Sequence, residues 1–429
     1  MRLTRRGKSA LISSLAVLAL GAGAGDPILL SAGAAVAAAT FLDFGIFVGA
    51  RAAARRSIRI LPSSVRGSTV AGEEYAAEIS LECATRGAAV SRVEAEPPFS
   101  LDAKKSANGH VARLAIKPVL LGKYMLSEVQ VRMCSLLGFF SSSAKGKADV
   151  EVRAYPRFYP ALLEALSLLE GGAGEGDARS GRIGRGTEYA WSREYEPGDS
   201  MKLIDWKSTA RRGKYCVKDF HEERGEGALV VFDGRAPGPI SADEMARDFL
   251  SALLGFAREG RRISVALLNS GGVLMAERVP AEVALEMGIR EVFKMERLAD
   301  YAPYELFPPG VRSQLERMGV PESGERGGVS ADFRKAYDDL ARRLRGSKAD
   351  VLYVGCPIYD AGSLLGLAEA VAEGGGRLRA MVPKKAWLDA DDLDRAYSMK
   401  KTLLKTHQAL ERIGIVGVTD PAAPLAQAA

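Results

Sequence analysis

The sequence predicts a multidomain protein with a membrane-spanning start, an all-β part and an α/β part. Two long apolar segments lie near the N-terminus, and short runs with period-two alternation fill residues 58–156. Buried strands then alternate with amphipathic helices over residues 226–420. A chain of 429 residues has room for two or three domains, and 47% hydrophobic residues are typical of globular chains.

Residues 1–57 are expected to form a transmembrane helical hairpin. Ser9–Ala24 and Ile28–Ala50 are apolar apart from Asp43, and Asp26-Pro27 separates them. Each segment is near the 17–25 residues that a bilayer requires. Basic residues before the first segment and after the second place both ends in the cytoplasm, by the positive-inside rule.

A signal peptide followed by a single span is the alternative for this region. The apolar stretch Leu11–Leu20 and the small residues after it fit a cleavable leader. Asp43 would mark a functional path if it faced a cavity. We expect it instead to face the partner helix or nearby hydroxyl groups.

The excess positive charge is concentrated at the N-terminus. The whole chain has a formal net charge of +6, and residues 1–59 hold eight Arg or Lys residues against two Asp. The remainder of the chain is therefore neutral. This distribution favours membrane-flanking charge and disfavours a nucleic-acid partner.

The cysteines do not form a recognisable metal or disulfide pattern. The four of them, Cys83, Cys134, Cys216 and Cys356, are far apart and include no C-x-x-C pair, and the chain has only three histidines. A zinc site is not supported. We expect free, mostly buried thiols in a reducing compartment.

Residues 58–156 predict a small β-sandwich of immunoglobulin-like type. About seven short alternating runs, such as Val129–Arg132 and Val150–Tyr155, are separated by Gly, Pro and Ser. Such a domain binds another molecule or acts as a spacer between domains. A helix and a Gly-rich linker are expected over residues 157–186, because Gly171–Gly186 lacks the G-x-x-x-x-G-K-[ST] pattern of a phosphate loop.

Residues 187–225 alternate charged residues with large aromatic ones. Unpaired buried charges are costly, so this pattern indicates a partly buried network of ion pairs over aromatic faces. Pro197-Gly198 suits a tight turn, and Asp199 or Ser200 is expected to cap a short helix that Gly213 ends. The candidate network residues are Arg193, Glu194, Tyr195, Gly198, Asp199, Asp205, Trp206, Lys207, Arg211, Lys218, Glu222 and Arg224.

Two interpretations of this network remain open. In the first, it is an ion-pair brace that holds the linker to the following domain. In the second, it is a ligand-binding or hydrolytic site over residues 186–224. Asp199, Asp205 and Glu222 would then be acid–base groups or metal ligands, with Arg193 and Arg211 as anion clamps. Balanced charges and the lack of a nucleophile–histidine constellation favour the brace.

This segment resembles the signature of the domain of unknown function 58 family. The resemblance rests on Arg193-Glu194-Tyr195, Pro197-Gly198-Asp199, Ile204-Asp205-Trp206-Lys207 and Glu222-Glu223-Arg224. Leu137-Gly138-Phe139-Phe140 is similar to an aromatic loop of the same family. The resemblance implies a membrane-anchored protein with a von Willebrand factor A-like, Rossmann-like domain, and a MoxR-type AAA ATPase as partner.

Residues 226–420 predict an open, mostly parallel sheet covered by helices, which fits the implied A-like domain. Strands are expected at 228–233, 263–268, 273–278, 350–354, 378–382 and 415–418, and helices at 243–259, 330–345, 361–373 and 391–412. Tyr301–Gly328 is expected to be a surface loop, and residues 421–429 a disordered tail.

The metal-binding loop typical of A-like domains is degenerate here. That fold often binds a divalent cation through D-x-S-x-S after the first strand, whereas this chain has Asp233-Gly234-Arg235-Ala236-Pro237. Arg235 would place its own charge at the cation position, so no metal or other cofactor is expected. Asp233 is expected to pair with Arg235 or to cap the next helix.

Taken together, the sequence favours a non-enzymatic, membrane-anchored scaffold or adaptor that faces the cytoplasm. Its partners would be the lipid bilayer and a protein bound through the A-like domain. No catalytic residue is assigned. The alternative is the ligand-binding or hydrolytic site at residues 186–224.

Overall fold

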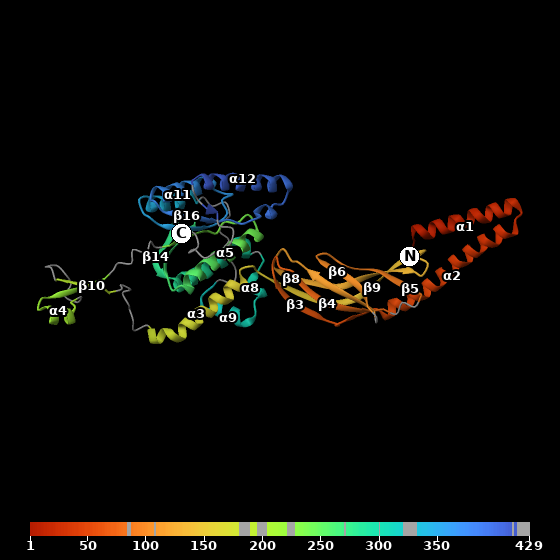
Figure 1. Cartoon of the computed structure of the whole chain (residues 1–429), viewed down its shortest axis with the longest axis horizontal. Coiled ribbons are helices and arrows are strands. Elements are labelled where there is room, and N and C mark those ends of the chain that lie inside the picture. The colour runs from red at the N-terminus through yellow and green to blue at the C-terminus, as the bar shows by residue number, and fades with distance from the viewer. Residues whose placement is uncertain are drawn as a thin grey trace. The chain divides into compact units, whose positions relative to one another are not determined.

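The computed structural model describes residues 1–83, 87–106, 109–179, 189–194, 204–220, 228–269, 272–299, 301–320, 333–413 and 416–417. Contacts divide the chain into two compact units (Figure 1). The first contains residues 1–157 together with Pro303–Phe307, and the second contains residues 158–302 and 308–429. Two apolar N-terminal helices, an all-β part and a mixed α/β part give the chain a multidomain layout.

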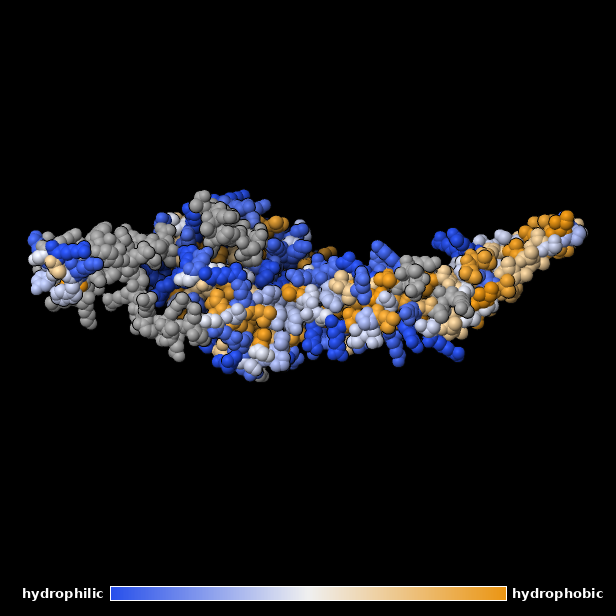
Figure 2. Space-filling model, turned by 60° about the horizontal axis from the view of Figure 1, so that its bottom comes forward, coloured by the Kyte–Doolittle hydropathy of each residue, from blue (hydrophilic) through white to orange (hydrophobic). Residues whose placement is uncertain are grey.

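The first unit begins with a pair of long apolar helices that run side by side (Figure 1). Helix α1 spans Arg5–Ala24 and helix α2 spans Pro27–Ser57, and both are long and apolar enough to cross a membrane. Their surface is largely apolar (Figure 2). Thr4 caps α1 and Asp26 caps α2 through side-chain oxygens, which satisfies amide groups at each helix start.

Small residues bring the two helices together. A Cβ on Gly21 of α1 would lie 2.8 Å from the amide nitrogen of Leu30, and one on Gly33 of α2 would lie 2.7 Å from the side chain of Leu18. Small side chains at such positions allow close approach of the two backbones. The Oγ of Ser14 donates to the carbonyl of Gly33 at 3.2 Å.

The second half of α2 packs into the all-β part of the unit. Phe47 and Ala54 are fully buried there, and the ring of Phe47 stacks on that of Phe140. Asp43 accepts a hydrogen bond from the amide of Leu137 at 3.3 Å. The first alternative for Asp43, that it faces the partner helix, is therefore wrong: its carboxylate faces the turn between Ser135 and Phe140.

The all-β part consists of two sheets. One has the order β1 (Arg2–Leu3), β9 (Phe140–Tyr155), β8 (Gly122–Ser135) and β5 (Ala88–Ala95), with β3 (Val65–Val70) also paired to β9. The other has the order β2 (Arg59–Leu61), β4 (Tyr75–Glu82), β7 (Gly109–Ile116) and β6 (Phe99–Ser106). The described part of residues 58–156 thus contains eight strands, one more than expected.

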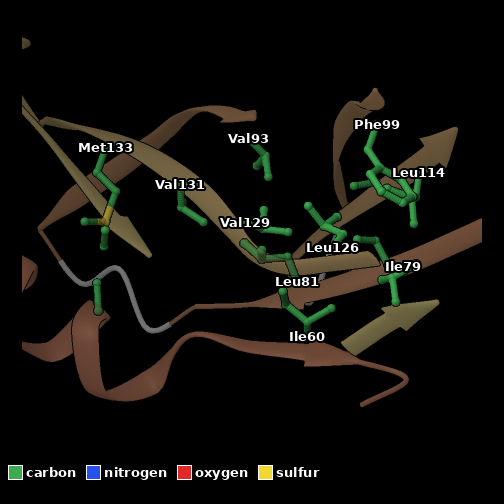
Figure 3. Close-up of a cluster of buried hydrophobic side chains, with 14 of the residues drawn as sticks. Ile60, Ile79, Leu81, Val93, Phe99, Leu114, Leu126, Val129, Val131 and Met133 are labelled. Carbon is green, nitrogen blue, oxygen red and sulfur yellow. The ribbon is translucent and has the colours of Figure 1, made fainter. Parts of the chain in front are cut away.

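Alternating side chains of both sheets form one core between them (Figure 3). Leu81 and Leu114 come from the second sheet, and Val129 and Val131 come from the first, all 1% exposed or less. The period-two patterns of the sequence correspond to this inward and outward alternation.

The second unit contains a six-stranded sheet with helices on both faces. The strand order is β14 (Gly272–Pro280), β13 (Arg262–Asn269), β12 (Leu229–Asp233), β15 (Asp350–Val354), β16 (Arg377–Met381) and β17 (Val416–Gly417). All neighbours are parallel except β13 and β14. The expected open, mostly parallel sheet is confirmed.

The helices divide between the two faces because adjacent strand residues point in opposite directions. Leu229 and Val231 of β12 pack in a cluster with α10 (Arg334–Leu344), α11 (Ala361–Glu373) and α12 (Leu393–Arg412). Phe232 faces the other way and stacks on Phe249 of α5 (Pro239–Arg258) at 4.1 Å between ring centroids. Further helical elements of this unit are α3 (Tyr159–Arg179), α6 (Ala281–Lys294), α7 (Glu296–Ala299) and the 3-10 turn η2 (Ala386–Asp389).

Two predicted irregular segments contain helices. Within the predicted loop Tyr301–Gly328, α8 (Pro303–Leu306) and α9 (Pro309–Arg317) form, and Phe307 and Leu315 are buried. The loop prediction is wrong over residues 303–317, where short helices form and bury these apolar side chains. Helix α3 also continues to Arg179, through the first half of the expected linker. The predicted tail 421–429 lies outside the described residues.

Candidate functional site

The described part of the charged, aromatic segment is a two-stranded ribbon with a short helix. Strand β10 (Tyr189–Glu194) pairs antiparallel with β11 (Cys216–Phe220), and α4 (Trp206–Arg212) precedes β11. Gly213 ends α4 with φ of 66°, as expected from the sequence.

Asp205 holds this small element together. Its Oδ1 accepts from the amides of Lys207 and Ser208, at 3.1 and 3.2 Å, and its Oδ2 accepts from the Ser208 hydroxyl at 2.9 Å. Its own amide donates to the carbonyl of Cys216 at 2.8 Å. Asp205 is therefore the N-cap of α4, and the prediction that Asp199 or Ser200 caps this helix is wrong.

The other predicted network residues lie on β10, β11 and α4 or outside the described part of the chain. Arg193 and Glu194 stand opposite Val217 and Cys216 in the ribbon, and Lys218 stands opposite Ser192. Trp206, Lys207 and Arg211 are exposed on α4, with Trp206 66% exposed. Tyr195, Gly198, Asp199, Glu222 and Arg224 lie outside the described residues.

A second polar cluster lies at the carboxyl end of the central strand β12. Asp233, which is fully buried, accepts from the amide and Nε of Arg235 at its Oδ1, both at 3.0 Å. Its Oδ2 accepts from Nη2 of Arg235 at 2.6 Å and from the hydroxyl of Tyr337 at 2.8 Å. The Tyr337 and Tyr353 hydroxyls are 2.9 Å apart. The expected pairing of Asp233 with Arg235 is confirmed.

Aromatic rings enclose the guanidinium of Arg235. Its central carbon lies 4.1 Å from the ring centroid of Phe333 and about 6 Å from those of Tyr337 and Tyr359. Burial lowers the pKa of Arg235, but the hydrogen bonds and charge of Asp233 outweigh this effect and raise it above its ordinary value. The guanidinium is therefore a fixed positive charge at the position expected for a divalent cation.

A third polar contact fills the N-terminus of α5. The carboxylate of Asp389, in η2, accepts from the amides of Ile240 and Ser241 at 2.9 and 2.8 Å. A Cβ on Gly238 would lie 2.6 Å from Asp389, so only glycine permits this approach. Sequence reasoning missed Asp389, because 148 residues separate it from Ser241 and no local pattern marks it.

Next to η2, the same edge of the sheet holds an open cavity of about 320 Å³. Its walls come from the ends of β15 and β16, from η2 and from one side of α12. The floor is mostly apolar, and the ammonium of Lys400 lies 5.6 Å from the ring centroid of Trp387. Its lining includes Lys384, Trp387, Lys400, Leu404, His407 and Glu411. In the sequence, only the amphipathic pattern of α12 points to this cavity.

The thiols do not add a reactive group to this edge. Burial raises the pKa of Cys356, which follows β15, to about 12, so it is protonated at neutral pH. Cys216 is also buried, whereas Cys83 and Cys134 are only partly buried. Among the described residues, no group of three or more His, Cys, Asp or Glu side chains could hold a metal ion.

These features define a protein whose α/β sheet has the polar groups at its edge paired by other residues of the same chain. The chain also contains an all-β part and two apolar helices. Comparison with known proteins finds a family match over part of the chain. Residues 191–356 match the family described as "Protein of unknown function DUF58". The uncharacterized protein YeaD of Bacillus subtilis (strain 168) is 28% identical over 114 residues, which cover 26% of this chain and 28% of that protein.

Two solved structures are similar over 23% of the chain, at TM-scores too low to support an argument about fold. The sialic acid binding region of a Streptococcus sanguinis SK1 adhesin has a TM-score of 0.16 and 14% identity, with 29% of its chain covered. The ASH/PapD-like domain of human CEP192 has a TM-score of 0.17 and 10% identity, with 84% of its chain covered.

Proposed function

We propose that this protein is a membrane-anchored, non-enzymatic scaffold or adaptor that binds a protein partner through its α/β domain. In this proposal the α/β domain is von Willebrand factor A-like, the two-sheet part is an immunoglobulin-like spacer, and both face the cytoplasm. The family resemblance supplies the class of partner, a MoxR-type AAA ATPase.

The observation that carries the proposal is that both charged positions at the sheet edge are filled by the chain itself. Asp233 is neutralised by Arg235, where related folds often bind a cation, and the N-terminus of α5 is capped by Asp389, where an anionic ligand would bind. A small charged substrate would have to displace a buried partner at either position. A surface that binds through shape and side-chain contacts does not carry this cost.

The cavity beside η2 is the surface that we assign to the partner. Its apolar floor accommodates a large apolar side chain, and Lys384 and Lys400 line it with positive charge. The fitting occupant is a protein segment with an exposed apolar anchor flanked by Asp or Glu. Asp389 fixes η2 to α5, so this wall is held in place before the partner arrives.

Membrane anchoring is proposed from the two helices and their flanks. Strand β1 precedes α1 and pairs with β9, and α2 leads directly into β2, so both ends of the helix pair lie on the two-sheet domain. A hairpin with two spans fits this geometry better than a cleaved leader, because cleavage would remove β1. The basic residues on both flanks favour the cytoplasmic side.

The test is affinity purification of the detergent-solubilised chain from native membranes, with and without ATP analogues, after chemical crosslinking. We expect an AAA ATPase in stoichiometric amount, with crosslinks to residues 384–411. Recovery without an ATPase would refute the assigned partner class.

A hydrolytic site at residues 186–224 is the second candidate, and Asp205 weighs against it, because its carboxylate caps α4. An Asp205→Asn variant that folded normally, kept its partner and lost a small-molecule turnover would favour this candidate instead.

A further inference from the structure

The turn between β8 and β9 exposes two adjacent leucines. Leu136 is 64% exposed and Leu137 is 51% exposed. Single exposed apolar residues are common, but neighbouring ones at a turn tip mark a contact surface when they continue another apolar surface. The membrane proposal does not by itself account for this turn.

This turn is fastened to the base of the helix pair. The hydroxyl of Thr4 donates to the carbonyl of Gly138 at 2.6 Å, and the amide of Thr4 donates to the carbonyl of Phe139 at 2.9 Å. On the other side, the amide of Leu137 donates to Asp43 of α2. A Cβ on Gly7 would lie 2.3 Å from the Phe139 carbonyl oxygen, so α1 touches the turn directly.

Helix lengths place the turn at the edge of the hydrocarbon layer. At 1.5 Å per residue, the uncharged part of α1, Ser9–Ala24, is about 24 Å long, and so is the part of α2 before Asp43. The hydrocarbon core of a bilayer is about 30 Å thick. A hairpin that crosses it therefore brings Thr4, Asp43 and the leucines of the turn to the boundary between acyl chains and headgroups.

Basic side chains surround this boundary. Arg5, Arg6 and Lys8 are exposed on the first two turns of α1. A Cβ on Gly138 would lie 4.0 Å from Nη1 of Arg6, so this guanidinium stands beside the turn. Apolar side chains next to Lys and Arg are the combination that binds the interface of membranes with anionic lipid.

We propose that the β8–β9 turn, Leu136–Phe139, is a second membrane contact that inserts Leu136 and Leu137 into the interface and seats the two-sheet domain on the bilayer. Arg5, Arg6 and Lys8 bind anionic headgroups around it. This inference rests on the proposed membrane anchoring, and it assigns the leucines to lipid rather than to a second copy of the chain.

Tryptophan quenching by brominated lipid tests this contact in the full-length chain. The three native tryptophans are replaced by Phe, and Leu137→Trp is reconstituted into phosphatidylcholine–phosphatidylglycerol vesicles whose acyl chains are brominated near the headgroup. We expect blue-shifted emission and quenching at least threefold stronger than for Val119→Trp. Val119 is a matched exposed control at the other end of β8, which is about 45 Å long.

Ile12→Trp, on the exposed side of α1, reports hairpin insertion independently. Quenching of Ile12→Trp without quenching of Leu137→Trp would overturn the second contact and leave the anchor intact. No quenching at either position would refute the anchor itself. A blue shift at Leu137→Trp without bromine quenching would assign the leucines to a contact with a second copy of the chain. Equal quenching in vesicles of pure phosphatidylcholine would refute the binding of anionic headgroups by Arg5, Arg6 and Lys8.

Discussion

At the scale of residues, Arg235 and Asp233 form a buried ion pair at the carboxyl end of β12. Its guanidinium donates to Asp233 through two nitrogens, Nε and Nη2, inside an aromatic enclosure. The backbone amide of Arg235 and the hydroxyl of Tyr337 donate the other hydrogen bonds to this carboxylate. Asp233 and Arg235 therefore act as a structural unit of the sheet edge.

Removing Arg235 is expected to destabilise the α/β domain strongly. Arg235→Met leaves Asp233 as an unpaired buried charge, which costs about 3–5 kcal/mol in the free energy of unfolding. Asp233→Asn combined with Arg235→Met should recover at least half of this loss. Denaturant unfolding in detergent measures both, and EDTA should leave the native chain unchanged.

Arg258→Met is the matched control, because Arg258 pairs with Glu164 at the surface and its side chain is 62% exposed. We expect a loss below about 1 kcal/mol there. A loss of similar size for Arg235→Met and Arg258→Met would contradict the structural account of the buried pair.

The same cluster predicts a loss of stability at alkaline pH. Burial raises the pKa of Cys356 from 9.0 to about 12 and raises the pKa values of Tyr337 and Tyr353 well above 10.0. The folded state therefore holds protons that the unfolded state releases, so this stability is complete below pH 9 and declines as pH rises towards 12.

Cys356→Ala removes one of the groups that release a proton on unfolding at alkaline pH. The variant should show a shallower decline between pH 9 and 12, by up to about 1.4 kcal/mol per pH unit. Unfolding free energies at pH 8, 9, 10 and 11 measure the slope. An unchanged slope would show that Cys356 does not stay protonated in the folded protein.

At the scale of elements, the helix pair depends on small residues where the backbones approach. A Cβ on Gly21 would lie 2.8 Å from the amide nitrogen of Leu30, whereas a Cβ on Gly23 would meet no atom within 4 Å. Gly21→Ala should therefore strain the pair by about 1–3 kcal/mol. Gly23→Ala, the matched control, should keep or improve helix stability.

Hydrogen exchange of α1 and α2 in detergent measures this difference. We expect about tenfold or faster exchange in Gly21→Ala, because each 1.4 kcal/mol changes an opening equilibrium tenfold. Equal exchange in the two variants would mean that the helices do not pack through Gly21.

Elements with strong local patterns could be predicted from the sequence, and long-range partners could not. The β12 and β15 strands are buried apolar runs, which the sequence displays directly. The segment around Leu306 and Phe307 looks like a loop, because Pro, Gly and charged residues surround its few apolar side chains. Asp389 caps a helix far away in the sequence, and only the fold reveals that contact.

At the scale of the whole molecule, one chain links two apolar helices long enough to cross a membrane, a two-sheet domain, and an α/β domain with an open cavity beside η2. Substitutions at Lys400 and Lys405 test whether this cavity binds the protein partner. Lys400 lines it, whereas Lys405 lies about 140° further around α12 at 100° per residue. Charge reversal at the two positions changes net charge equally.

The most direct measurement is the amount of protein partner that copurifies with the native chain, Lys400→Glu and Lys405→Glu from crosslinked native membranes. We predict at least a tenfold loss for Lys400→Glu, with Lys405→Glu close to the native chain, at equal expression and unfolding temperature. Equal partner recovery by all three chains would contradict the assignment of partner binding to this cavity.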